Sequence, residues 1–133
     1  MIYKNYEKCT KLLINTEYHL QKEVVKFLRK QNLLFSLTHT ETMLSNPQLR
    51  RESYEMGYTK GMPDLIIYTP NDTYSMLCIE LKSPWSNGEL SKEQEKILDR
   101  FSDECNALCL VSNDLVEIIT IINDYKNNNL KDL

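Results

Sequence analysis

The sequence of 133 residues lacks features that would place it in several common protein classes. It has no run of 18 apolar residues, so we expect no transmembrane helix. Its first eight residues do not resemble a signal peptide, and we expect an intracellular, soluble protein in the cytoplasm of a host or bacterium. The four cysteines have no paired CxxC spacing, so we expect reduced, packed thiols rather than disulfides or zinc ligands.

The chain also lacks an excess of basic residues. Its formal net charge is −3, whereas nucleic-acid binding usually leaves a basic footprint. A metal-dependent enzyme can still be acidic overall, since the ion neutralises its site carboxylates and only a local basic surface meets phosphate. The two histidines, His19 and His39, are isolated, and we expect each to be a structural or surface residue.

The length and composition are typical of one soluble globular domain. Hydrophobic residues make up 41% of the chain and charged residues 26%. We expect a single domain over 1–133, with its core at about 15–125. Residues 1–13 are expected to form a peripheral arm and 126–133 a polar tail that frays.

Two apolar segments, 61–68 and 74–84, lie on either side of a polar turn and predict a hairpin of buried strands. Three charged residues lie inside this hairpin. Asp64 opens the first strand, and Glu80 and Lys82 are two residues apart on the second. Because side chains alternate along a strand, Glu80 and Lys82 share one face.

The length of the turn decides where the two acids lie. If Thr69 is opposite Ser75, then Asp64 falls opposite Glu80, and their side chains approach to about 5 Å. A turn one residue shorter would put the two carboxylates on opposite faces of the sheet.

The apolar surroundings favour a chemical role for these charges. Burying unpaired carboxylates is costly, and two neighbouring ones also repel, so a cation must compensate. Asp64, Glu80 and the backbone carbonyl of Leu81 would form an all-oxygen site for Mg²⁺ or Mn²⁺. Lys82 would orient or deprotonate a water, or offset charge on a phosphate, which describes metal-assisted phosphodiester hydrolysis. The alternative is an exposed cross-strand ion pair, which contributes only about 0 to 1 kcal/mol.

At this point the sequence resembles a known family. Pro63-Asp64 followed by Glu80-Leu81-Lys82 is similar to the PD-(D/E)XK nuclease signature, and the wider pattern resembles its VRR-NUC (virus-type replication-repair nuclease) branch. The matching positions are Glu17 with Gln21, Gly57 with Gly61, Ser83-Pro84, Gly88, Leu90-Ser91 with Gln94, and a final strand at 107–112. The name of the branch also points to a phage or large-virus origin.

The resemblance implies two further site residues, each with a simpler alternative. Glu17 is implied as a third acidic group, although a first-turn glutamate is also favoured by the helix dipole. Gln94 is implied as an active-site residue, although its spacing from Ser91 also fits a capping box.

The order of predicted elements gives an α/β fold with a central mixed sheet and helices on both faces. This agrees with the restriction-endonuclease-like core that the resemblance implies. The expected elements are a helix from Asn15 or Thr16 to Gln31, a strand at 33–40, a short capped helix through Glu55, the hairpin, a helix from Ser91 to Cys105, a strand at 107–112, and a helix from Asn113 or Asp114 to Asn123.

The polar segment 41–60 feeds directly into Gly61 and Asp64, so its basic and aromatic side chains are candidates for nucleic-acid contacts. An ordinary solvated loop is the alternative. Trp85 is a candidate for stacking on a base, against the commoner role of packing over the end of the sheet. The candidate nucleic-acid-binding residues are Arg50, Arg51, Lys60, Trp85 and Lys92.

The function expected from these residues and the resemblance is a Mg²⁺- or Mn²⁺-dependent endonuclease. Family members that stand alone resemble enzymes that cleave four-way junctions or branched DNA as homodimers, and a two-fold dimer would place two sites on two strands. No membrane partner and no small-molecule cofactor are expected. A catalytically silent module that binds nucleic acid or a replication partner is the second hypothesis, and a structural accessory protein is the third.

Overall fold

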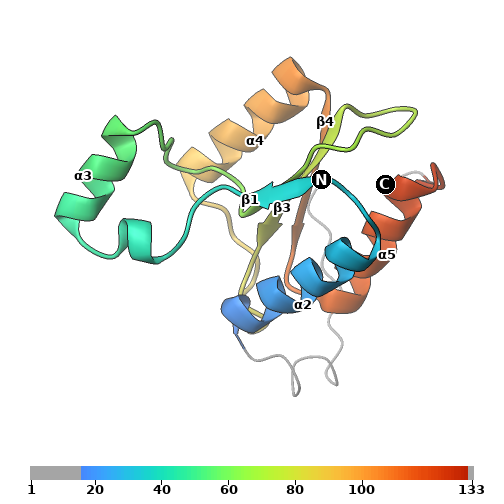
Figure 1. The fold of residues 1–133 in the computed structure, drawn as a ribbon, viewed down its shortest axis with the longest axis horizontal. Helices are drawn as coiled ribbons and strands as arrows, with labels where there is room; N and C mark the ends of the chain where they lie inside the picture. Colours follow the sequence, from blue (N-terminus) through green and yellow to red (C-terminus); the bar gives the residue numbers. More distant parts are fainter. Residues whose placement is uncertain (1–15, 132–133) are drawn as a thin grey trace.

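A four-stranded mixed sheet forms the centre of the computed structural model, which describes residues 16–131 (Figure 1). The strands are β1 (Phe35–Leu37), β2 (Leu65–Ile67), β3 (Met76–Leu81) and β4 (Ala107–Ser112), and they lie in this order across the sheet. The pairs β1–β2 and β2–β3 are antiparallel and β3–β4 is parallel. The predicted mixed sheet is confirmed, although the strand expected over 33–40 is ordered as a strand only within β1.

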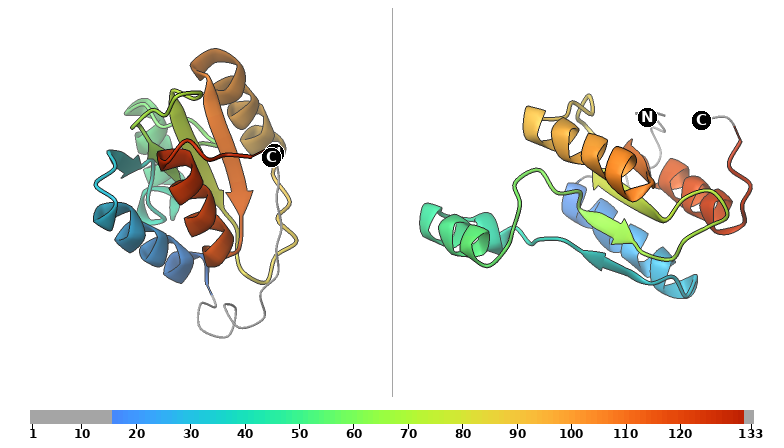
Figure 2. Two further views of the ribbon diagram at one scale, coloured as in Figure 1. Left: turned by 90° about the vertical axis from the view of Figure 1, so that its right-hand side faces the viewer. Right: turned by 90° about the horizontal axis from the view of Figure 1, so that it is seen from above.

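Helices cover both faces of this sheet, as predicted (Figure 2). On one face α2 (Glu17–Lys30) packs beside α5 (Leu115–Lys126), and on the other lies α4 (Lys92–Cys105). Among residues 16–131, no helix combines the length and apolar character needed to cross a lipid bilayer.

The alternation of side chains along β3 divides the core into two parts. Leu77, Ile79 and Leu81 are fully buried against α2 and α5, whereas Cys78 lies on the opposite face with Leu98 of α4. Glu80 belongs to this second face, because it is two residues from Cys78.

The described cysteines, Cys78, Cys105 and Cys109, are free thiols, as expected. Cys9 and the predicted N-terminal segment 1–13 lie outside the described residues.

Each helix of eight or more residues within 16–131 begins where the sequence provides a capping side chain. The side chains of Thr16, Asn46, Ser91 and Asp114 each accept a hydrogen bond from a backbone N–H in the first turn that follows. At Ser91 the reciprocal bond from the third helical residue completes a capping box. The predicted helix starts are therefore confirmed.

The closing helix runs past its predicted end at Asn123 and includes Lys126. Tyr125 explains the difference, because its ring is fully buried and its hydroxyl donates to the carbonyl of Thr69 over 2.8 Å. This contact joins α5 to the hairpin turn, 56 residues earlier in the chain, and no local pattern predicts it.

The residues after α5 also pack onto the domain. The side-chain oxygen of Asn128 accepts from the backbone N–H of Asp72 over 2.7 Å, and Leu130 packs against the core. The prediction of a tail that frays from residue 126 is therefore wrong for residues 126–130.

Residues 42–57, here called the arm, project away from the sheet (Figures 1 and 2). The arm consists of a 3₁₀ turn, η1 (Thr42–Leu44), and the short helix α3 (Pro47–Glu55), which was predicted from Asn46 and Pro47. Neither element contains a buried residue, and the two pack chiefly against each other. Most of the packing of the arm is therefore within the arm itself.

Gly61 joins the arm to the site because it allows a close approach of two backbones. Its φ is +92°, and a Cβ at this position would lie 2.6 Å from the carbonyl oxygen of Glu93 in the first turn of α4. Only a glycine fits both conditions. The contact brings the segment that leads to Asp64 against the start of α4.

We expect Gly61→Ala to destabilise the protein more than Gly57→Ala. Both glycines have a positive φ, but a Cβ at Gly57 meets nothing within 4 Å. Both substitutions cost about 1 kcal/mol of backbone strain, and only Gly61→Ala adds an overpacking cost of about 1–3 kcal/mol. Thermal unfolding of the two variants measures the difference, and equal melting temperatures would contradict the close contact.

Candidate active site

Two buried carboxylates lie side by side on the face of the sheet that α4 covers. Leu65 pairs with Ile79, and the same register continued by one residue places Asp64 opposite Glu80. The exposed fraction of the residue is 8% for Asp64 and 3% for Glu80. The structure thus has the register of the longer turn, and the alternative of an exposed surface pair does not describe these two residues.

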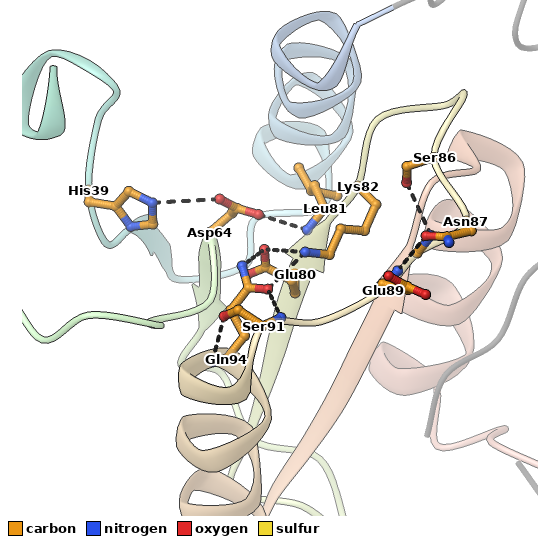
Figure 3. A network of polar contacts seen from close by, with 11 residues as sticks. His39, Asp64, Glu80, Leu81, Lys82, Ser86, Asn87, Glu89, Ser91 and Gln94 are labelled. Carbon is orange, nitrogen blue, oxygen red and sulfur yellow. Dashed lines mark hydrogen bonds and ion pairs between the residues drawn. The ribbon is translucent and has the colours of Figure 1, made fainter.

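The backbone of Leu81 and the side chain of Lys82 contact the two carboxylates (Figure 3). The N–H of Leu81 donates to Oδ2 of Asp64 over 2.7 Å. Lys82 lies on the same side as Glu80, as predicted, with its Nζ 3.7 Å from Oε1 of Glu80. The ammonium group is therefore the nearest positive charge to Glu80 in the described part of the chain.

Gln94 connects the start of α4 to both charged groups. Its Nε2 donates to Oε1 of Glu80 over 2.9 Å, and its Oε1 accepts from Nζ of Lys82 over 2.9 Å. The same Oε1 accepts from the N–H of Ser91, over 2.9 Å, to complete the capping box. The two roles weighed for Gln94, helix cap and site residue, are thus combined in one side chain.

The buried environment of Asp64 and Glu80 disfavours two negative charges side by side. Burial, and then the charge of Asp64, raise the pKa of Glu80 to about 8, against the opposing effect of Lys82. Burial also raises the pKa of Asp64, although the N–H of Leu81 and the imidazole of His39 act in the other direction. The described residues therefore compensate this pair only in part, and a further cation would stabilise its ionised form.

The donor set fits a partly hydrated Mg²⁺ or Mn²⁺ ion. Within residues 16–131, no three His, Cys, Asp or Glu side chains are grouped closely enough to hold a metal ion by themselves. Mg²⁺ does not need such a cage, because it is usually bound by one or two carboxylates together with several waters. Paired carboxylate oxygens also suit Mn²⁺, whereas structural zinc takes sulfur and nitrogen ligands.

Glu17, at the start of α2, lies at the rim of the same site. The residue is exposed, yet it lines the cavity next to Asp64 and Glu80. Partial burial, and then the charge of Asp64, raise its pKa to about 6, while Lys82 acts in the opposite direction. The charges of the site therefore affect the pKa of Glu17, although Glu17 is not part of the buried pair. Gln21, one turn further on, does not line the cavity.

His39 is a site residue that the sequence reasoning missed. The hydroxyl of Thr38 is 2.5 Å from the carbonyl oxygen of Pro63 and 2.8 Å from Nδ1 of His39. Its single proton goes to the carbonyl, which can only accept, so Nδ1 must be the donor to Thr38. This leaves Nε2 of His39 facing Oδ1 of Asp64 at 3.8 Å. The only sequence signal is that His39 follows the strand that pairs with β2.

A cavity of about 450 Å³ opens over these groups and is closed on one side by the arm. Of the predicted nucleic-acid-binding residues, Arg50 and Lys60 line it. Arg51, Trp85 and Lys92 do not line it, and all three are exposed. Trp85 has an exposed fraction of 58%.

The fold and this site define a class of protein. Two acids and a lysine on adjacent strands of a mixed sheet, with helices on both faces, form a nuclease-type core of the PD-(D/E)XK kind. The chain belongs to the VRR-NUC domain family, whose profile matches residues 14–113. A solved structure described as a "VRR_NUC domain protein" has the same fold, with a TM-score of 0.66 and 21% sequence identity over 84% of this chain and 88% of that one. A comparison with curated proteins gave no match.

The raised pKa of Glu80 predicts how stability depends on pH when divalent ions are removed. Between its ordinary pKa of 4.5 and about 8, the folded protein holds a proton that the unfolded chain has released. The free energy of unfolding therefore falls as the pH rises through this range. We expect Glu80→Gln, which stays uncharged, to be about 4 kcal/mol more stable than the wild type near pH 8 and equally stable near pH 4.

Thermal unfolding in a chelator across this pH range measures the effect. Glu55→Gln is the matched control, because Glu55 is exposed on α3 and does not line the cavity. The difference in stability between Glu55→Gln and the wild type should not change with pH. Parallel curves for Glu80→Gln and the wild type would show that Glu80 is not held in its protonated form.

Proposed function

We propose that this protein is a metal-dependent endonuclease that hydrolyses phosphodiester bonds in DNA. The observation that carries the proposal is the buried pair Asp64 and Glu80, whose raised pKa values call for a cation. Membership of the VRR-NUC family supports it. A bound Mg²⁺ or Mn²⁺ ion would polarise the phosphate and make a bound water more acidic.

The residues of the chain have separate roles in this proposal. Asp64 and Glu80 supply carboxylate oxygens. The Leu81 carbonyl supplies a third ligand, because the N–H and C=O of a strand residue point to the same side and this N–H already meets Asp64. Lys82 donates to the attacking water or to the phosphate, and Gln94 fixes the position of its Nζ. Glu17 adds a third acidic group at the rim.

The proposed substrate is branched DNA, with two copies of the chain acting as a homodimer. The net charge of −3 leaves only local basic groups for phosphate contact, and Arg50 and Lys60 provide these beside the carboxylates. A domain of this size offers little surface for selecting a complex substrate alone. A symmetric pair would present two sites to the two strands of a junction.

We expect Lys82→Ala to reduce cleavage by about 10²- to 10⁴-fold, because the substitution removes the ammonium that orients the water or phosphate. The measurement is cleavage of labelled four-way junction, flap, duplex and single-stranded DNA in Mg²⁺ or Mn²⁺. Lys131→Ala is the matched control, since this lysine is exposed beyond α5 and should leave the rate unchanged. Equal cleavage by Lys82→Ala and the wild type would mean that the activity does not come from this site.

Calorimetry with Mn²⁺ separates an enzyme from a silent binding module. The wild type should bind the ion, and Asp64→Asn should lose the binding while its amide oxygen still accepts from the Leu81 N–H. Without metal, Asp64→Asn should melt no lower than the wild type, because it removes one of two buried charges that repel each other. Binding of Mn²⁺ without cleavage of any DNA substrate would favour the silent module, and unchanged binding by Asp64→Asn would remove the proposed metal site.

A further inference from the structure

The cavity beside the two carboxylates has two walls of different chemistry. Asp64, Glu80 and Gln94 form the polar wall, which accounts for the proposed hydrolysis. The other wall contains Tyr54 and Tyr58, with the apolar side chains of Leu44 and Met62. Neither phosphate binding nor metal binding requires this second wall.

Tyr58 is held firmly within this wall. Its ring lies edge-on to His39, with 5.3 Å between the ring centroids and 61° between the ring planes. Burial raises the pKa of the Tyr58 hydroxyl, and a backbone hydrogen bond at Gly61 acts against this rise. Contacts at both the ring edge and the hydroxyl fix the ring beside Asp64.

Tyr54 presents an open ring to the same cavity. Its exposed fraction is 73%, which is high for a large aromatic side chain. It lies four residues after Arg50 on α3, and residues at this spacing share one face of a helix. Both side chains line the cavity. One face of the arm therefore carries a cation suited to phosphate and an aromatic ring suited to a flat apolar group.

The size of the cavity admits more than a phosphate. Its volume of about 450 Å³ lies within the usual range of small-ligand sites. On a nucleic acid, the flat group next to a phosphate is the nucleobase. In a stacked duplex both faces of each base are covered by its neighbours, so a tyrosine ring can stack only on a base that has left the stack.

The energies indicate which substrates would supply such a base. Stacking on an aromatic side chain contributes about 1–3 kcal/mol per base, whereas extracting a paired base costs a few kcal/mol. For a paired base, the stacking energy and the cost of extraction nearly cancel. A base that is already unpaired enters at little cost and keeps the whole gain.

We infer that this cavity binds one unstacked nucleobase on Tyr54 and Tyr58, next to the phosphate at the carboxylates, so that the protein selects DNA with an unpaired nucleotide at that point. The inference rests on the proposed nuclease function, and it names the feature of the substrate that the site recognises. Arg50 holds a flanking phosphate, and the two rings hold the base.

The test uses a DNA duplex with a short single-stranded gap that contains 2-aminopurine, whose fluorescence falls when it stacks on an aromatic ring. Binding is measured in Ca²⁺ instead of Mg²⁺. We expect the wild type to quench the fluorescence and Tyr54→Ala to bind the gapped DNA about tenfold more weakly without the quenching. Tyr54→Phe keeps the ring and should behave as the wild type. Binding to fully paired duplex should change less than binding to gapped DNA.

Tyr18→Ala is the matched control, because Tyr18 is also exposed, with a fraction of 61%, but lies on α2 outside the cavity. It should retain both the affinity and the quenching. Absence of quenching by the wild type, or equal weakening of gapped and paired DNA by Tyr54→Ala, would overturn the inference. Equally tight binding of a free mononucleotide would also overturn it, since the site would then be one for a small ligand.

The base site and the proposed hydrolysis depend on different residues, so experiments can distinguish them. Cleavage that requires Lys82 but is indifferent to Tyr54 would leave the nuclease intact and remove the base site. Quenching that requires Tyr54, without any cleavage that requires Lys82, would keep the base site and remove the proposed hydrolysis.

Discussion

The repulsion between two buried carboxylates is the constraint on which the rest of the site depends. Asp64 and Glu80 are brought together by the pairing of β2 with β3 and are largely buried beside the start of α4. Neighbouring groups offset the repulsion in part, with the Leu81 N–H at Asp64 and Lys82 and Gln94 at Glu80. Such an arrangement is unfavourable unless a cation completes it.

Much of this arrangement could be predicted from the sequence, because it depends on local rules. The period of two along β3 puts Glu80 and Lys82 on one side. Two registers stayed open for Asp64, according to the length of the polar turn, and the structure has the one that brings Asp64 opposite Glu80. The helix starts follow from their capping residues, and the capping spacing of Ser91 and Gln94 fixes the start of α4. These features need information from only a few neighbouring residues.

The features that could not be predicted depend on contacts between distant segments. His39 reaches Asp64 only because β1 pairs with β2, and Tyr125 extends α5 through a bond to the hairpin turn. The arm was predicted to contain a helix, but its direction is set by its two ends and by the approach of Gly61 to α4. Periodicity says which side of an element is apolar, whereas it does not say which other element lies there.

The double role of Gln94 restricts which residue can occupy its position. A glutamate would cap the helix equally well and would still accept from Lys82. It would not, however, donate to Glu80, and it would bring another carboxylate against the buried pair. Glutamine and glutamate are therefore equivalent as capping residues, but they differ in their effect on the buried acids. The neutral amide of glutamine allows the capped start of α4 to lie against the acidic pair.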